Sequence, residues 1–120
     1  GEKRDWYLKG WQDRPMFVSV DEDHEAAAIM IINDPVRDFD RIRSLVKQGY
    51  LVRTRADSGT QEARSNDTVR RNKAFQSGAQ AISTDYFLST NPFDSKYSVS
   101  IQAGIRCNPV LISENCPVLE

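Results

Sequence analysis

The sequence predicts an α/β fold with a parallel sheet. Short apolar segments that favour strands alternate with segments that favour helices, the connections between them are short, and glycine or proline marks several boundaries. Consecutive units of this kind form a parallel sheet, either open or closed into a (β/α)₈ barrel. Strands are expected near residues 16–20, 26–32, 50–56 and 79–85.

The first two predicted strands differ in their patterns. Residues 16–20 (MFVSV) follow a proline and end at an acidic run, which is typical of a brief strand that leads into a loop. Residues 26–32 (AAAIMII) are continuously apolar, which favours a strand covered on both faces, although the start of a helix has the same pattern.

Two helices are predicted between the strands. The first begins at Pro35, with Asn33 or Asp34 as its cap, and ends at Gly49. Its apolar face consists of residues spaced by three or four, namely Val36, Phe39, Ile42, Leu45 and Val46. The second helix is predicted over 67–77, and its Arg70-Arg71 pair is expected on a solvated face.

The predicted strand 50–56 (YLVRTRA) alternates between an apolar face and a charged one. If helices cover Val52 and its neighbours, Arg53 and Arg55 point to the opposite side of the sheet. Guanidinium groups in such a place need carboxylate partners or an anionic ligand, and their planar geometry suits a phosphate. The alternative is that both arginines simply form ion pairs with Asp57 and Asp85.

Composition restricts the class of protein. The 120 residues fit a single segment, 1–120, with a loop-rich tail over 88–120, and a closed barrel typically needs ~250 residues. With 16 basic and 17 acidic residues the net charge is −1, so no overall field favours nucleic acid. The longest apolar run is far shorter than the ~20 residues of a transmembrane helix. Any secretion signal is expected to lie outside this sequence.

Three further sets of residues have chemistry that the pattern leaves open. Cys107 and Cys116 lie in a loop-like setting with prolines nearby, where a disulfide and two free thiols are both possible. The only histidine, His24, lies in an acidic stretch and is expected to be a solvated loop residue. Asp57, Glu62, Asn66 and Asp67 are oxygen donors of the kind that Ca²⁺ binds, but their spacing is not that of an EF-hand.

Three ordered blocks resemble the C-terminal part of the calcium-dependent phosphoinositide phospholipase C-like family. They are 49–57 (GYLVRTRAD), 62–71 (EARSNDTVRR) and 77–86 (SGAQAISTDY). The resemblance covers about residues 17–108. One departure follows Asp57, where the family tends to have Ala-Asp-Thr and this chain has Ser-Gly-Thr over 58–60.

The resemblance implies the C-terminal part, about four βα units, of a TIM-barrel phosphodiesterase. Such an enzyme cleaves a phosphodiester by histidine acid/base catalysis with Ca²⁺, whose ligands are expected mostly outside this chain. Arg53, Arg55 and Tyr86 become candidates for binding phosphate or inositol, and Asp57 and Asp85 become candidates for the catalytic carboxylates. The histidine pair is expected in an N-terminal half or a second chain, the substrate is a phospholipid, and the location is extracellular or periplasmic.

Two alternatives remain at this point. The segment could be non-catalytic, with the Arg and Asp side chains in permanent ion pairs, or it could belong to a hydrolase that resembles glycerophosphodiester phosphodiesterases. The isolated 120-residue chain is expected to be inactive, and it is expected to pair with another chain because half a barrel leaves strand edges uncovered.

Overall fold

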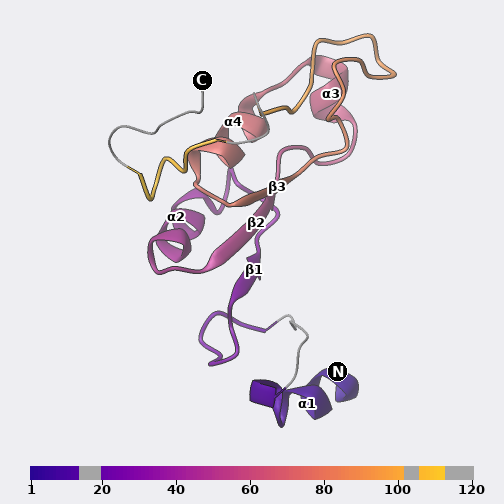
Figure 1. The fold of residues 1–120 in the computed structure, drawn as a ribbon. Helices are drawn as coiled ribbons and strands as arrows, with labels where there is room; N and C mark the ends of the chain where they lie inside the picture. The colour runs from indigo at the N-terminus through magenta and orange to yellow at the C-terminus, as the bar shows by residue number, and fades with distance from the viewer. Residues whose placement is uncertain (14–19, 102–105, 113–120) are drawn as a thin grey trace.

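The structure is a computed structural model that describes residues 1–13, 20–101 and 106–112. Three strands among these residues form one parallel sheet in the order β1-β2-β3, which confirms the α/β class (Figure 1). The elements, in chain order, are α1 (Glu2–Leu8), the 3₁₀ helix η1 (Trp11–Asp13), β1 (Ile29–Ile31), α2 (Phe39–Lys47), β2 (Leu51–Arg55), α3 (Gln61–Ser65), α4 (Val69–Gln76) and β3 (Ala81–Ser83).

Each strand lies inside a predicted segment but is shorter than that segment. β1, β2 and β3 lie within 26–32, 50–56 and 79–85. Of the predicted strand 16–20, residues 16–19 lie outside the described part of the chain, and Val20 belongs to no strand. The strands are short because a parallel ladder continues only where the neighbouring backbone runs alongside.

Just before β3, the side chain of Gln80 makes the hydrogen bonds to β2 that a strand backbone would make. The Oε1 atom of Gln80 accepts the amide hydrogen of Val52 at 2.8 Å, and its Nε2 atom donates to the Tyr50 carbonyl at 3.2 Å. These bonds occupy the β2 edge just before the backbone pairing of Arg53 with Ala81 begins. The strand therefore starts later than its apolar pattern predicts.

Helix α2 begins after a turn over residues 35–38 and not at the predicted Pro35. The Asp34 carboxylate accepts the amide hydrogens of Val36 and Arg37, both at 3.2 Å, so it stabilises this turn as a cap would. At the other end Gly49 has φ 94°, and the helix ends there as predicted.

The second predicted helix is confirmed, with α4 inside 67–77. The Asp67 carboxylate accepts the Val69 amide hydrogen at 2.9 Å and so helps to begin α4. Helices α3 and α1 were not predicted from the sequence. Both are short, with five and seven residues, and neither has the long three- and four-residue apolar repeat that identified α2.

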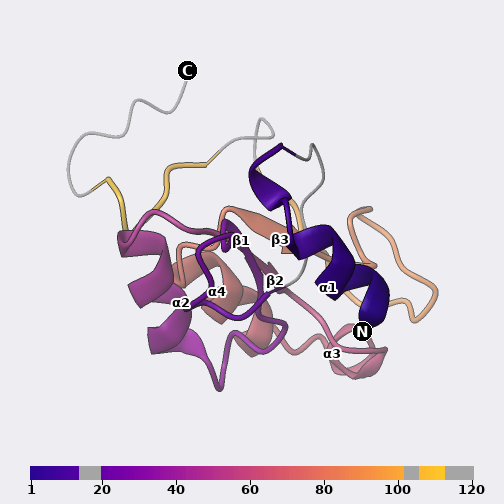
Figure 2. The same cartoon turned by 90° about the horizontal axis from the view of Figure 1, so that it is seen from below.

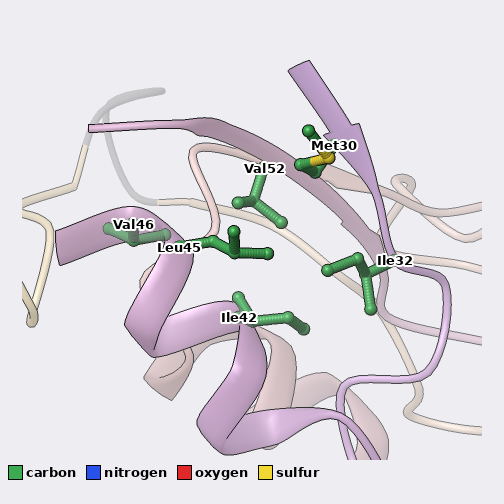
Figure 3. Packing of buried hydrophobic residues seen from close by; sticks show 6 residues of the cluster. All are labelled: Met30, Ile32, Ile42, Leu45, Val46 and Val52. Atoms are coloured by element: carbon green, nitrogen blue, oxygen red, sulfur yellow. The ribbon is translucent and has the colours of Figure 1, made fainter. Parts of the chain in front are cut away.

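Helix α2 packs against one face of the sheet and forms the main core. Figure 3 shows its apolar side chains directed towards those of β1 and β2. Ile42 and Val46 are fully buried, and Val52 is 1% exposed. The core cluster consists of Met30, Ile32, Ile42, Leu45, Val46 and Val52.

A second cluster lies nearer the carboxyl ends of the strands. Tyr97 and Val99, from the segment predicted to be a loop-rich tail, pack with Ala56 and Ala63. Tyr97 is fully buried, and its hydroxyl donates to the Ala56 carbonyl at 3.0 Å. The described part of this segment, though irregular, thus contributes to the core.

The other face of the sheet is not covered by the described residues. Helices α2 and α4 lie on the same side of the strands, whereas α1 is set apart from both (Figures 1 and 2). On the uncovered face Ile31 and Leu51 are 59% and 51% exposed. The expectation that 26–32 is covered on both faces is therefore wrong for the described part of the molecule, because no second layer of it packs there. None of the described helices has the length and apolar content needed to cross a bilayer.

Candidate functional site

Polar side chains gather at the carboxyl end of the sheet. The strands are parallel, so Asn33 after β1, Arg55 at the end of β2 and Asp85 after β3 lie along one edge. The register places Arg53 beside Ile31 on one side and Ala81 on the other. Parallel α/β proteins generally hold their ligands at this edge.

Arg53 lies on the uncovered face, and within the described residues its side chain donates to a single acceptor. Its Nη1 atom donates to the Oδ1 atom of Asn33 at 2.5 Å. Among the described residues it forms no ion pair with Asp57 or Asp85. A guanidinium has five N–H donors, so the remaining donors of Arg53 can receive an anion.

Arg55 has carboxylate partners. Its Nη2 atom lies 3.1 Å from Oδ2 of Asp85 and 3.8 Å from Oδ1 of Asp57. The side chain of Arg55 is 32% exposed, that of Asp85 is 65% exposed, and that of Asp57 is fully buried. The Nε atom of Arg55 is buried and has no partner in the described structure. The contacts of Arg55 are therefore those expected if the arginines form ion pairs with Asp57 and Asp85. The contacts of Arg53 are not.

The Asp57 carboxylate joins the ends of two strands. It accepts a hydrogen bond from the Thr84 hydroxyl and another, at 3.3 Å, from the Asp85 amide. With Arg55 as a third partner, the carboxylate is bound on all sides by groups of the protein. Its observed contacts are those of a residue that holds the β2 and β3 ends together.

Tyr86 follows Asp85 and closes this edge of the sheet. Its hydroxyl donates to the Gly59 carbonyl at 3.1 Å, and its ring meets that of Tyr97 edge to face with centroids 5.6 Å apart. Burial raises the pKa of Tyr97 to about 12, with a smaller contribution from the negative charge of Asp57. These aromatic contacts fix the loop that begins at Thr84.

Arg70 was assigned by the sequence to a solvated helix face, and this assignment is wrong. Its side chain is only 21% exposed, its Nε atom lies 3.2 Å from Oε1 of Glu62, and its Nη1 atom lies 3.6 Å from Oδ1 of Asp34. Nη1 also donates to the Asn33 carbonyl at 3.2 Å. The signal available in the sequence was the position of Arg70 four residues before Ala74, which is fully buried on the same helix.

The remaining predicted residues lie away from this edge. The Nδ1 atom of His24 accepts the Ala26 amide hydrogen at 3.0 Å, so the histidine stabilises a local turn. It is partly buried, not fully solvated as expected. Cys107 lies in a half-buried position near the C-terminal end, and Cys116 lies outside the described residues. The disulfide between the two stays a prediction.

The arrangement described so far defines an α/β protein with a candidate anion site at the carboxyl edge of a parallel sheet. A family model described as phosphoinositide phospholipase C, Ca²⁺-dependent, matches residues 2–109. The chain therefore belongs to the Ca²⁺-dependent phosphoinositide phospholipase C family. No significant match was found among curated proteins or among solved structures.

Several carboxylates of the described residues are paired with arginines. No cluster of three or more histidine, cysteine, aspartate or glutamate side chains suitable for a metal ion occurs among them. Asp57 and Asp85 share Arg55, and Glu62 pairs with Arg70. A hard cation such as Ca²⁺ takes six to eight oxygen ligands, and these carboxylates are already used by guanidinium groups.

Proposed function

We propose that this chain is the substrate-binding C-terminal portion of a phosphodiesterase that cleaves phosphoinositides. The observation that carries the proposal is the partly exposed guanidinium of Arg53, which lies on the uncovered face of the sheet and donates to the Asn33 side chain after β1, its one acceptor among the described residues. The chain that carries it is a phosphoinositide phospholipase C family member. The guanidinium would hold the phosphate through charge-assisted hydrogen bonds. The complete domain would be a TIM barrel, of which β1, β2 and β3 are consecutive strands.

The other site residues have separate roles in this proposal. Arg55 and Asp85 form an exposed ion pair in which Asp85 can orient a catalytic histidine or a substrate hydroxyl. The buried carboxylate of Asp57 fixes the position of Arg55 and Asp85 through its contacts with both. The ring of Tyr86 lines the mouth of the site. Asp57 is therefore proposed as a positioning residue and not as a group that meets the substrate.

Proton transfer requires residues beyond this sequence. Histidine acid/base catalysis of the kind that the resemblance implies needs two histidines, and these 120 residues contain one, whose Nδ1 accepts a local amide hydrogen. The catalytic pair and the Ca²⁺ ligands would then be supplied by another part of the protein or by a second chain. By itself the chain binds and orients, and it is proposed to be inactive.

Two exposed apolar residues support a lipid-borne substrate. Phe87 and Leu88 follow directly after the Asp85-Tyr86 pair and are 67% and 57% exposed. They stand beside the proposed headgroup site, where a phospholipid would place its glycerol and acyl chains. An extracellular or periplasmic location, where such lipids are met from outside the cell, is part of the proposal.

A titration with inorganic phosphate and with inositol 1-phosphate tests the binding role. We expect saturable binding of both by the chain, weakened about tenfold to a hundredfold by Arg53→Gln, since a charge-assisted hydrogen bond contributes ~1.5–3 kcal/mol. Arg4→Gln, on α1 away from the sheet, is the matched control and should bind as the unmodified chain does. Equal affinities for the Arg53 and Arg4 variants would refute the role of Arg53.

The ion pairs of Arg55 favour a second candidate, a non-catalytic segment with permanently paired charges. Under that candidate no saturable phosphate binding occurs, and the intact protein does not cleave phosphatidylinositol. Under the leading proposal the intact protein cleaves it, and Asp85→Asn lowers kcat about tenfold or more. The matched control is Asp94→Asn, at an exposed loop position. Turnover of glycerophosphodiesters in place of phosphatidylinositol would instead indicate a hydrolase that resembles glycerophosphodiester phosphodiesterases.

A further inference from the structure

Arg70 connects the loop that follows β1 with the loop that follows β2, the strand that contains Arg53. From α4 it reaches the Asn33 carbonyl and the Asp34 carboxylate, both in the loop after β1. It also meets Glu62 on α3. The second carboxylate oxygen of Glu62 accepts the amide hydrogen of Ser58 at 3.2 Å, so the same contact extends to the loop after β2.

A chain of contacts connects Arg70 to the proposed phosphate ligand. The main chain of Asn33 receives a hydrogen bond from Arg70, while its side-chain oxygen receives one from Arg53. Asn33 is exposed and follows Ile32, whose amide makes the last backbone hydrogen bond of this strand to β2, with the Arg53 carbonyl at 2.9 Å. Beyond that bond, the contact of Asn33 with Arg70 is the one that holds its carbonyl in the described structure.

Burial and charge explain why an arginine is needed at position 70. The side chains of Arg70 and Glu62 are 21% and 13% exposed, so their ion pair is screened less than a surface pair. Arg70 and Asn33 also line the same cleft of about 730 Å³ along β1. A lysine would preserve the charge but cannot present several N–H donors in a planar fork, so it could not serve all three partners.

We propose that Arg70 is a positioning residue that holds Asn33 and, through it, turns the guanidinium of Arg53 towards a phosphate group. The inference rests on the proposed function, since it assigns the residue that prepares that site. Arg70 does not itself touch the phosphate. Its effect on binding passes through the Asn33 side chain.

A double-mutant cycle on phosphate affinity tests this route. Arg70→Lys should weaken inorganic phosphate binding about threefold to tenfold, the size of a coupling within one hydrogen-bond network. In an Asn33→Ala background the same substitution should have no further effect, because the side chain that transmits it is gone. Equal effects of Arg70→Lys in both backgrounds would overturn the proposal, and so would full affinity in the single variant.

A second measurement decides the matter even if the chain binds no phosphate. The guanidinium of Arg53, identified in nitrogen-15 NMR spectra by its loss in Arg53→Lys, should rotate slowly about its Cζ–Nε bond in the unmodified chain. Arg70→Lys should speed this rotation, and Arg71→Lys, which removes a guanidinium bound to the Ser98 carbonyl, should not. An unchanged rate in Arg70→Lys would refute the positioning role, whereas absent phosphate binding with an altered rate would refute only the proposed function. Urea midpoints of each variant show whether the fold is retained.

Discussion

The hydroxyl of Thr84 donates a hydrogen bond to the fully buried carboxylate of Asp57. Thr84 comes one residue after β3, and Asp57 comes two residues after β2, so the bond joins the carboxyl ends of two neighbouring strands. The same carboxylate binds the Asp85 amide. The loop that contains the candidate residues Asp85 and Tyr86 is thus held by a buried negative charge.

Replacing that carboxylate should destabilise the protein. We expect Asp57→Asn to lower the free energy of unfolding by about 1–3 kcal/mol, because the new amide group presents a donor where Thr84 or Asp85 already donates. Urea denaturation measures the change. Asp94→Asn, at an exposed position with a φ of 53° that asparagine accepts, is the matched control and should stay within about 0.5 kcal/mol. Similar midpoints for the two variants would contradict the structural role of Asp57.

The side chain of Gln80 should protect the amide of Val52. In Gln80→Ala that amide, on a residue 1% exposed, loses its acceptor, and we expect a loss of about 1–3 kcal/mol and faster hydrogen exchange at Val52. Gln61→Ala, at an exposed position at the start of α3, should change neither quantity measurably. Unaltered exchange at Val52 in the Gln80 variant would mean that the side chain does not extend the ladder.

Two glycines with similar backbone conformations should respond differently to alanine. Gly78 has φ 81°, and a Cβ atom there would meet Cγ2 of Val110 at 2.4 Å; Gly49 has φ 94° and open space around it. We expect Gly49→Ala to cost about 1 kcal/mol from the left-handed conformation alone, and Gly78→Ala to cost about 1–3 kcal/mol more from the collision. Thermal or urea unfolding compares them. Equal losses would show that Val110 does not pack against Gly78 in solution.

Alkaline pH should destabilise the protein through Tyr97. Its pKa is raised from 10 to about 12 by burial, so its contribution to stability is complete below pH 10. Between about pH 10 and 12 the unfolded state loses this proton before the folded state does, and the free energy of unfolding falls. The test compares urea midpoints of the unmodified chain and of Tyr97→Phe from pH 9 to 12. Between pH 10 and 12 the urea midpoint should fall less in Tyr97→Phe than in the unmodified chain. An equal fall in both proteins would refute the raised pKa of Tyr97.

Local chemistry explains why several elements could be predicted. Asp34 and Gly49 act on backbone groups within a few residues of themselves, so their roles at the two ends of the α2 region follow from the order of the residues. The three- and four-residue apolar spacing that predicted α2 also places Ile42 and Val46 in the core. For the same reason the alternation in β2 correctly separated Val52 from Arg53.

Pairing between distant segments could not be predicted in this way. Arg70 pairs with Asp34 and Glu62, and its partner in sequence, Arg71, donates to the carbonyl of Ser98. The spacing of Arg70 to Ala74 places it beside a buried position of α4, but the distant partners of these arginines are not contained in that local pattern. Likewise the composition of the segment that contains Tyr97 indicated a loop, and only its burial against Ala56 shows that the segment belongs to the core.

The sequence by itself determined the α/β class, the alternation of strands and helices, and the placement of Arg53 and Arg55 on the face away from the helices. These features depend on periodicity and on residues close together in the chain. The tertiary structure decided which arginine has carboxylate partners in the described part of the chain: Arg55 is paired with Asp57 and Asp85, whereas Arg53 donates there to the amide oxygen of Asn33. The physical reason is that the reach of a guanidinium to a carboxylate is set by the register and the loops of three neighbouring strands, which no local pattern contains.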